Sequence, residues 1–159
     1  MKIENQLDKK WKRWYLGEVK TSGFNSFGCH LFCWTYLYSV KKGVQVSPGE
    51  VDGIFVRKGV YIQDMIQSDR AALALGMRWI GKETDINKAP DWFPTIKEVD
   101  FSIADGKQQH FVVRELVDGK KVILDPFEGV QRPINFYEKK TKAPNWENGR
   151  FSYRLIKIQ

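Results

Sequence analysis

The sequence has 159 residues, a length that suits one folded domain with a substantial core. Hydrophobic residues make up 42% and aromatic residues 14%, which excludes an intrinsically disordered chain. The net charge of +7 favours contact with polyanions such as nucleic acid, anionic lipid or an anionic cell-wall polymer, although a solvated basic surface is the default interpretation.

The sequence also argues against a membrane protein and a disulfide-stapled protein. No apolar run approaches the roughly 20 residues that a membrane-spanning helix needs, so we expect no membrane insertion. The N-terminus lacks the apolar stretch of a signal peptide, which predicts synthesis in the cytoplasm, with lysis or carriage in a larger particle as routes of release. Cys29 and Cys33 are the two cysteines, and a bridge between positions four apart would distort a helix, so we expect free thiols.

The chain divides into an N-terminal basic and aromatic segment, residues 1–20, and a single domain, residues 21–159. The segment carries Trp11, Trp14 and Tyr15 among lysines, and we expect it to pack on the domain. Neither internal repeats nor a low-complexity linker interrupts the domain.

Helix signals dominate the first half of the domain. Residues 21–28 are rich in Gly, Ser and Asn, which indicates a loop. The apolar run that follows is too long for a typical strand and ends in two lysines and a glycine, which predicts a helix from Cys29 to Lys42.

Two further helices are expected before residue 78. Ser47 as N-cap, with Pro48 at the first helical position and Glu50 at the third, predicts a helix that ends near residues 58–59. Apolar residues at helical spacing predict another helix within residues 61–76, ending at Gly76.

Strand signals take over from residue 78 onward. Short β-branched and aromatic segments cover residues 78–81, 93–102, 108–116, 120–126 and 151–158. Asp118 and Gly119 predict a tight turn that joins the third and fourth of these segments into a hairpin. Helices followed by a run of strands indicate an α+β fold with N-terminal helices packed on an antiparallel sheet.

Cys29 follows Gly28 at the point where the predicted loop ends and the helix begins. The unpaired N–H groups and the dipole of a helix N-terminus favour a thiolate, which is the nucleophilic form of cysteine. The backbone N–H of Cys29 would point into the same site, where it can stabilise an oxyanion. Cys33 lies one turn further along the helix and is typical of a core residue.

A thiol nucleophile needs a base, and the chain has two histidines. His30 is adjacent to Cys29 and on a helix would point about 100° away, so it is poorly placed to take the proton. His110 opens the first strand of the hairpin and can face Cys29 if the helix packs on the sheet.

A third residue completes the pattern. With the turn at residues 118–119, paired hairpin positions have residue numbers that sum to about 237, so Asp125 falls within two residues of the partner of His110. We expect Asp125 to orient the imidazole of His110. Each residue alone is more typical of a structural role, and it is the combination that favours a catalytic site.

The segments GCHLFCWTYLYS, VSPGEVDGIFVRKG, HFVVREL and VILDP resemble papain-like cysteine peptidases, and among them the C39-like peptidases found in bacterial and phage proteins. The resemblance spans residues 23–129. It implies a papain-like fold in which Cys29 is the nucleophile, His110 the general base and acid, and Asp125 the orienting group. It also implies cleavage of an amide bond in a peptide or peptidoglycan cross-bridge, with no metal or other cofactor required.

The chain departs from the family at two places. Papain-like enzymes carry a glutamine shortly before the cysteine as second oxyanion donor, and Gly23 occupies that position here. Asn25 offers the nearest carboxamide and is the predicted substitute, whereas Gln6 lies too far along the chain to assume. Bulky residues follow Cys29 where the family has small ones.

Two other functions stay open. The departures from the family leave a catalytically inactive C39-like binding domain as the first alternative. The net charge of +7 and the six tryptophans leave a nucleic-acid-binding protein as a second, less favoured alternative, with Trp11, Trp14 and Tyr15 as its stacking residues. No recognisable nucleic-acid-binding motif accompanies that charge.

Overall fold

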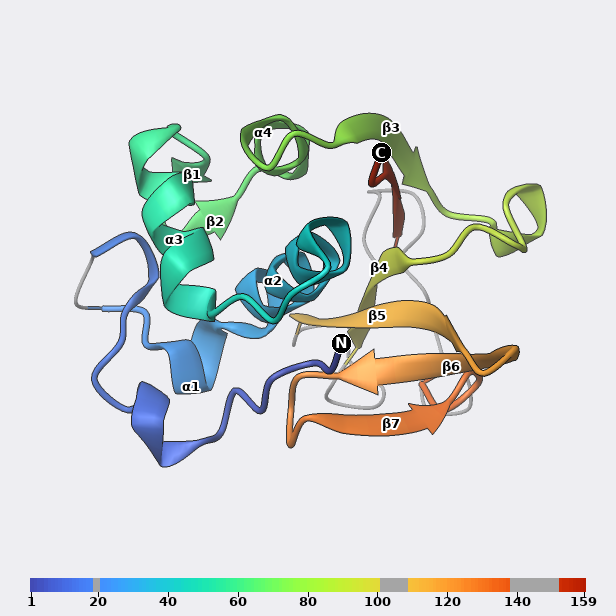
Figure 1. The fold of residues 1–159 in the computed structure, drawn as a ribbon, viewed down its shortest axis with the longest axis horizontal. Helices are drawn as coiled ribbons and strands as arrows, with labels where there is room; N and C mark the ends of the chain where they lie inside the picture. The colour runs from blue at the N-terminus through green and yellow to red at the C-terminus, as the bar shows by residue number, and fades with distance from the viewer. Residues whose placement is uncertain (19–20, 101–108, 138–151) are drawn as a thin grey trace.

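A computed structural model of the chain describes residues 1–18, 21–100, 109–137 and 152–159. Within these residues the chain forms four α-helices, which are α1 (Phe24–Phe27), α2 (Cys29–Lys42), α3 (Pro48–Arg57) and α4 (Ser68–Ala74). Short 3₁₀ turns occupy Lys9–Trp11, Leu16–Glu18 and Ile86–Lys88. Figure 1 shows the helices on one side of the molecule and most of the sheet on the other, with α2 lying between. None of the described helices is long and apolar enough to cross a membrane.

The main sheet has six strands in the spatial order β3-β8-β4-β5-β6-β7, and every neighbouring pair is antiparallel. Its strands are β3 (Arg78–Glu83), β4 (Thr95–Asp100), β5 (Gln109–Val117), β6 (Lys120–Asp125), β7 (Val130–Pro133) and β8 (Tyr153–Lys157). A separate antiparallel pair is formed by β1 (Tyr61–Ile62) and β2 (Met65–Ile66). The α+β class with an antiparallel sheet is therefore confirmed.

The helix from Cys29 to Lys42 has the predicted bounds. It ends because Gly43 takes a left-handed conformation with φ of 70°, which costs a glycine little. The start of α3 is also as predicted, since the Ser47 side chain accepts a hydrogen bond from the Glu50 backbone N–H at 3.2 Å.

The predicted helix over residues 61–76 is wrong in its first half, which forms the β1–β2 hairpin before α4 begins. Gln63 turns the chain with a positive φ of 55°, and the Tyr61 hydroxyl donates to the carboxylate of Asp52 in α3. Ile62 and Met65 are exposed, so they do not form the buried face that a helix would need. The predicted loop at 21–28 contains the single helical turn of α1.

The hairpin of β5 and β6 has the predicted turn and register. Asp118 and Gly119 both have positive φ, as a two-residue hairpin turn requires. Val113 pairs with Leu124, and the pairing continues in this register up to the turn. β7 then pairs with β6 beyond a short turn, and the sequence had not indicated this strand.

Apolar residues fill both faces of the sheet. The larger cluster lies between the sheet and α2, which packs on β5. The smaller cluster contains Val99, Val112, Ile123 and Tyr137. The N-terminal segment begins beside the sheet and crosses to the helical side (Figure 1), where Trp11 is buried against Phe32 of α2. The two halves of the molecule are therefore bridged by residues from the start of the chain.

Candidate active site

Cys29 is the first residue of α2, directly after the short turn of α1. The residue is 9% exposed and lines a cavity of about 520 Å³ between the helices and the sheet. The preceding Gly28 packs so closely on the chain that an added Cβ would lie 2.5 Å from the carbonyl oxygen of Phe24. The sequence pattern Gly-Cys thus reflects a crowded junction that presents a thiol to a cavity.

His110 and Asp125 lie on the same face of the β5–β6 hairpin. His110 Nε2 is 2.7 Å from Asp125 Oδ1, and the two residues are 4% and 0% exposed. Cys29 is a further hydrogen-bonding partner of the His110 side chain. Because Nε2 is engaged by the carboxylate, Nδ1 is the ring nitrogen left for the thiol. The structure therefore brings together the three residues that the sequence predicts as a catalytic set.

The electrostatics of this set favour a charged imidazole. Burial by itself lowers the pKa of His110, but its hydrogen bonds to Asp125 and Cys29 outweigh that effect and raise the pKa to about 9. Burial acts to raise the pKa of Asp125, yet the hydrogen bond and charge of His110, with contacts from other donors, hold this pKa below its usual value. Asp125 is thus an ionised acceptor for a protonated imidazole at neutral pH.

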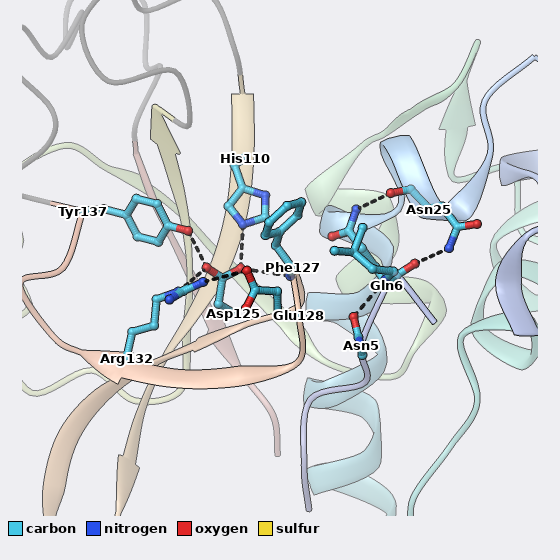
Figure 2. A network of polar contacts seen from close by, with 10 residues as sticks. Asn5, Gln6, Asn25, His110, Asp125, Phe127, Glu128, Arg132 and Tyr137 are labelled. Atoms are coloured by element: carbon cyan, nitrogen blue, oxygen red, sulfur yellow. Dashed lines mark hydrogen bonds and ion pairs between the residues drawn. The ribbon is translucent and has the colours of Figure 1, made fainter. Parts of the chain in front are cut away.

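Asp125 receives three more hydrogen bonds besides that of His110. The backbone N–H of Phe127 donates to Oδ1 at 3.0 Å, Arg132 Nε donates to Oδ2 at 2.9 Å, and the Tyr137 hydroxyl donates to Oδ2. Figure 2 shows His110, Arg132 and Tyr137 converging on this carboxylate.

The sequence did not point to Arg132 or Tyr137. Glu128 and Gly129 have positive φ and turn the chain back after Asp125, so that β7 lies beside β6. A turn recognised at residues 126–129 would have predicted this strand and placed Arg132 near Asp125. No local signal marks Tyr137.

Cys33 and His30 have structural surroundings. Cys33 is fully buried in the main cluster, and burial raises the pKa of its thiol. The His30 ring stacks on Phe111 at 3.9 Å between centroids and accepts a hydrogen bond from Trp34 Nε1 at 3.1 Å. Burial lowers the pKa of His30, so it stays neutral. Cys33 thus fits the core role expected for it, and His30 is a buried, neutral residue whose ring is held by Phe111 and Trp34.

Asn25 was predicted as an oxyanion donor, and its contacts do not favour that role. Its Nδ2 donates to the backbone carbonyls of Gln6 and Asp8, the latter at 3.2 Å. Both hydrogens of the carboxamide are therefore used to hold the N-terminal segment. The role of Asn25 as an oxyanion donor stays a prediction.

Gln6 is the carboxamide that sequence distance had set aside. It is buried, and its Nε2 donates at 3.2 Å to the carbonyl of Asn25, four residues before Cys29. Its backbone N–H donates at 2.9 Å to the carbonyl of Pro126, next to Asp125. Figure 2 shows the reciprocal bonds between Gln6 and Asn25. Only the fold reveals this proximity, since Gln6 is 23 positions away from Cys29 by the numbering.

The cavity beside Cys29 has an apolar rim and a charged interior. Phe27 and Met65, which are 59% and 61% exposed, lie among its lining residues. Inside, Arg154 Nη2 forms a buried ion pair with Glu98 Oε2 at 3.1 Å, and Gln109 Nε2 donates to the other oxygen of Glu98 at 2.9 Å. A polar chain such as a peptide could find both apolar and hydrogen-bonding surface in it.

Comparison with protein-family models, with curated proteins and with solved structures finds no match to this chain. Among the described residues, no group of three or more His, Cys, Asp or Glu side chains could hold a metal ion. Any functional assignment therefore rests on the residues and contacts of the site itself.

Proposed function

We propose that the chain is a papain-like thiol hydrolase that cleaves an amide bond through a Cys29–His110–Asp125 triad, as its resemblance to C39-like cysteine peptidases implies. One observation carries the proposal: a thiol at a helix N-terminus shares an imidazole with a buried carboxylate. Unrelated folds use this order of nucleophile, base and orienting group for acyl transfer.

The reaction would proceed in two halves. In the starting pair the proton of Cys29 already lies on His110 Nδ1, and the thiolate attacks the carbonyl carbon to form a tetrahedral oxyanion. His110 then protonates the leaving nitrogen as the C–N bond breaks, which leaves a thioester on Cys29. A water molecule loses its proton to His110 and attacks the thioester; the C–S bond breaks, the carboxylic acid is released, and the Cys29–His110 pair is regenerated.

The oxyanion needs donors that point to the carbonyl oxygen. The backbone N–H of Cys29, at the start of α2, is the first donor, because helix N-termini leave such groups unpaired. Gln6 is the better-supported second donor, since one hydrogen of its Nε2 goes to Asn25 and the described residues show no partner for the other. Asn25 has both hydrogens engaged with backbone carbonyls.

The substrate class follows from the resemblance and the charge of the chain. A peptide or peptidoglycan cross-bridge would lie in the cavity that Cys29 lines, across the apolar rim of Phe27 and Met65. The net charge of +7 would favour the anionic polymers of a cell wall.

Selective alkylation tests the proposal. We expect iodoacetamide at pH 6 to modify Cys29 much faster than Cys33, as mapped by mass spectrometry of the digest, and we expect His110→Ala to abolish the difference. The variant Cys33→Ala, which leaves the triad intact, is the matched control and should retain rapid alkylation of Cys29. Equal and slow labelling of both thiols in the wild-type protein would overturn the enzyme assignment in favour of a silent binding domain.

A further inference from the structure

Asp125 accepts more hydrogen bonds than it needs to orient one histidine. Oδ1 accepts from His110 and from the backbone of Phe127, while Oδ2 accepts from Arg132 Nε at 2.9 Å and from the Tyr137 hydroxyl. In Figure 2 Arg132 and Tyr137 approach the carboxylate from the side away from the helices. The carboxylate therefore has one oxygen for the imidazole and the other for two donors that the proposed reaction does not use.

The fold delivers Arg132 by strand register and Tyr137 by the turn that follows β7. Arg132 lies opposite Ile123 on neighbouring strands, so its side chain emerges on the face that Ile123 shares with Asp125. The guanidinium also stacks over Phe136, 4.5 Å from the ring centroid, which limits its movement. Tyr137 is 5% exposed and packs in the smaller apolar cluster. Packing thus helps to hold both side chains against Asp125.

The charges explain what Arg132 adds. In the reactive state four charged groups follow one another. They are the thiolate of Cys29, the imidazolium of His110, the carboxylate of Asp125 and the guanidinium of Arg132. Their two negative and two positive charges cancel. Without the guanidinium the buried set would carry one net negative charge, which is costly in a low-dielectric interior. The imidazolium would then balance the carboxylate, and the thiolate would be left without compensation.

Other charged groups near the set are few in the part of the chain that the structure describes. Glu128, in the turn before β7, lies 4.0 Å from Arg132 Nη2 and is more than half exposed, so solvent screens it. Cys33 faces the set from α2, and burial raises the pKa of its thiol, so it adds no charge at neutral pH. The guanidinium is therefore the main cation that Asp125 contacts besides His110.

We infer that Arg132 and Tyr137 are positioning residues of the proposed hydrolase: they neutralise and fix Asp125, so that the His110 imidazolium is available to the Cys29 thiolate. This inference rests on the proposed function. It assigns roles to two residues that neither the sequence pattern nor the family resemblance indicated.

The rate of Cys29 alkylation by iodoacetamide at pH 6 and at pH 10 tests the inference. At pH 10 an ordinary thiol is ionised without help, whereas at pH 6 it reacts only if an imidazolium stabilises the thiolate. For Arg132→Gln and Tyr137→Phe we expect the rate at pH 6 to fall about tenfold and the rate at pH 10 to stay within about twofold of wild type. Arg132→Lys, which keeps the charge, should lose less than Arg132→Gln.

Two controls separate this effect from a general loss of structure. Arg78→Gln removes one exposed positive charge far from the site on β3 and should leave both rates unchanged. Labelling of buried Cys33 in the same digest reports unfolding, and each comparison is made where Cys33 stays unlabelled. If Arg132→Gln does not fold, Tyr137→Phe and Arg132→Lys decide the question.

The outcomes distinguish the two proposals. The positioning role alone is overturned if wild-type Cys29 is alkylated selectively but neither Arg132→Gln nor Tyr137→Phe changes the ratio of its rates at pH 6 and pH 10. Equal and slow labelling of Cys29 and Cys33 in the wild-type protein overturns the hydrolase assignment and this inference with it. A fall in the rate at pH 6 alone, with partial retention in Arg132→Lys, supports both.

Discussion

His110 Nε2 lies 2.7 Å from Asp125 Oδ1, with both side chains withdrawn from solvent. A neutral imidazole has one donor and one acceptor nitrogen, so this contact decides which nitrogen holds the proton. Nδ1 can accept a proton from Cys29 only while Asp125 accepts one hydrogen bond from Nε2. The direction of proton transfer in the proposed reaction thus depends on the Asp125 carboxylate.

Asp125→Asn should reverse that tautomer. An amide group facing Nε2 would make Nε2 the acceptor and leave the proton on Nδ1, where it blocks transfer from Cys29. We expect alkylation of Cys29 at pH 6 to slow at least about tenfold, as wrong-tautomer variants of catalytic triads do. Stability should fall by about 3–5 kcal/mol in urea unfolding, because Arg132 loses its charged partner.

The matched control for this variant is Asp91→Asn. Asp91 pairs with Lys121 at 3.0 Å, but its side chain is 83% exposed, so solvent screens the contact. It should be neutral in both measurements. An Asp125→Asn protein that keeps wild-type reactivity at pH 6 would show that the carboxylate does not set the tautomer.

The local signals in the sequence explain why part of this site could be predicted. The Asp118-Gly119 turn has backbone torsions that fix a two-residue hairpin, and the hairpin register places Asp125 diagonally from His110. Gly43 ends α2 through its left-handed torsion, so the end of the Cys29 helix could be predicted from this glycine. Each of these features depends on a few consecutive residues.

The remaining features depend on contacts between distant segments. Gln6 reaches the site because its backbone and side chain bond to Pro126 and Asn25, which no sequence period encodes. The β1–β2 hairpin replaces a predicted helix because Tyr61 is tied to Asp52 of α3, and tertiary contacts override a short apolar pattern. Such errors are expected wherever propensity is weak and the partner lies far along the chain.

The stability of the protein should depend on pH through both histidines. Protonation of His110 should stabilise the fold, whereas protonation of His30 should destabilise it. The pKa of His110 is raised to about 9, above the ordinary 6.5, so its contribution is complete below pH 6.5 and is lost as the pH rises through about 9. The pKa of His30 is lowered by burial, so stability is lost as the pH falls below the ordinary value of 6.5. Urea unfolding should therefore give a maximum near pH 6.5.

Removal of one histidine tests this assignment. In His110→Gln the alkaline decline, on the order of a few kcal/mol, should disappear while the decline below pH 6.5 stays. Asp125, whose pKa is lowered, adds a further acid loss only as the pH falls below its usual value of 3.8. A His110→Gln protein that keeps the full alkaline decline would assign that decline to other groups.

Gln6 and Asn25 can be distinguished as oxyanion donors, because acylation forms a tetrahedral oxyanion and alkylation does not. With an activated ester as acyl donor, Gln6→Ala should slow acylation of Cys29 by about 10²-fold and leave its alkylation within about twofold. Asn25→Ala should slow neither reaction specifically, since its amide holds the backbone carbonyls of the N-terminal segment. It should instead cost about 1–3 kcal/mol of stability.

The opposite pattern would restore the assignment made from the sequence. A specific loss of acylation in Asn25→Ala, with Gln6→Ala unaffected, would mean that Asn25 turns toward the substrate when it binds. Mass spectrometry of the Cys29 peptide measures both modifications in a single digest, so no natural substrate is needed.

Gly28 should be required for close packing at the site, although its φ of −81° suits any residue. An added Cβ would lie 2.5 Å from the Phe24 carbonyl oxygen, and neither group can move without shifting the start of α2. We expect Gly28→Ala to destabilise the protein by about 1–3 kcal/mol and to reduce selective alkylation of Cys29, since crowding displaces the neighbouring thiol.

Gly53→Ala is the matched control. Inside α3 its Cβ meets only the flexible end of Arg57 at 3.3 Å, so thermal unfolding should show a gain of about 0.5–1 kcal/mol in stability. Equal effects of the two substitutions would mean that the junction before Cys29 has room for a side chain and that the Gly-Cys pair is not a packing requirement.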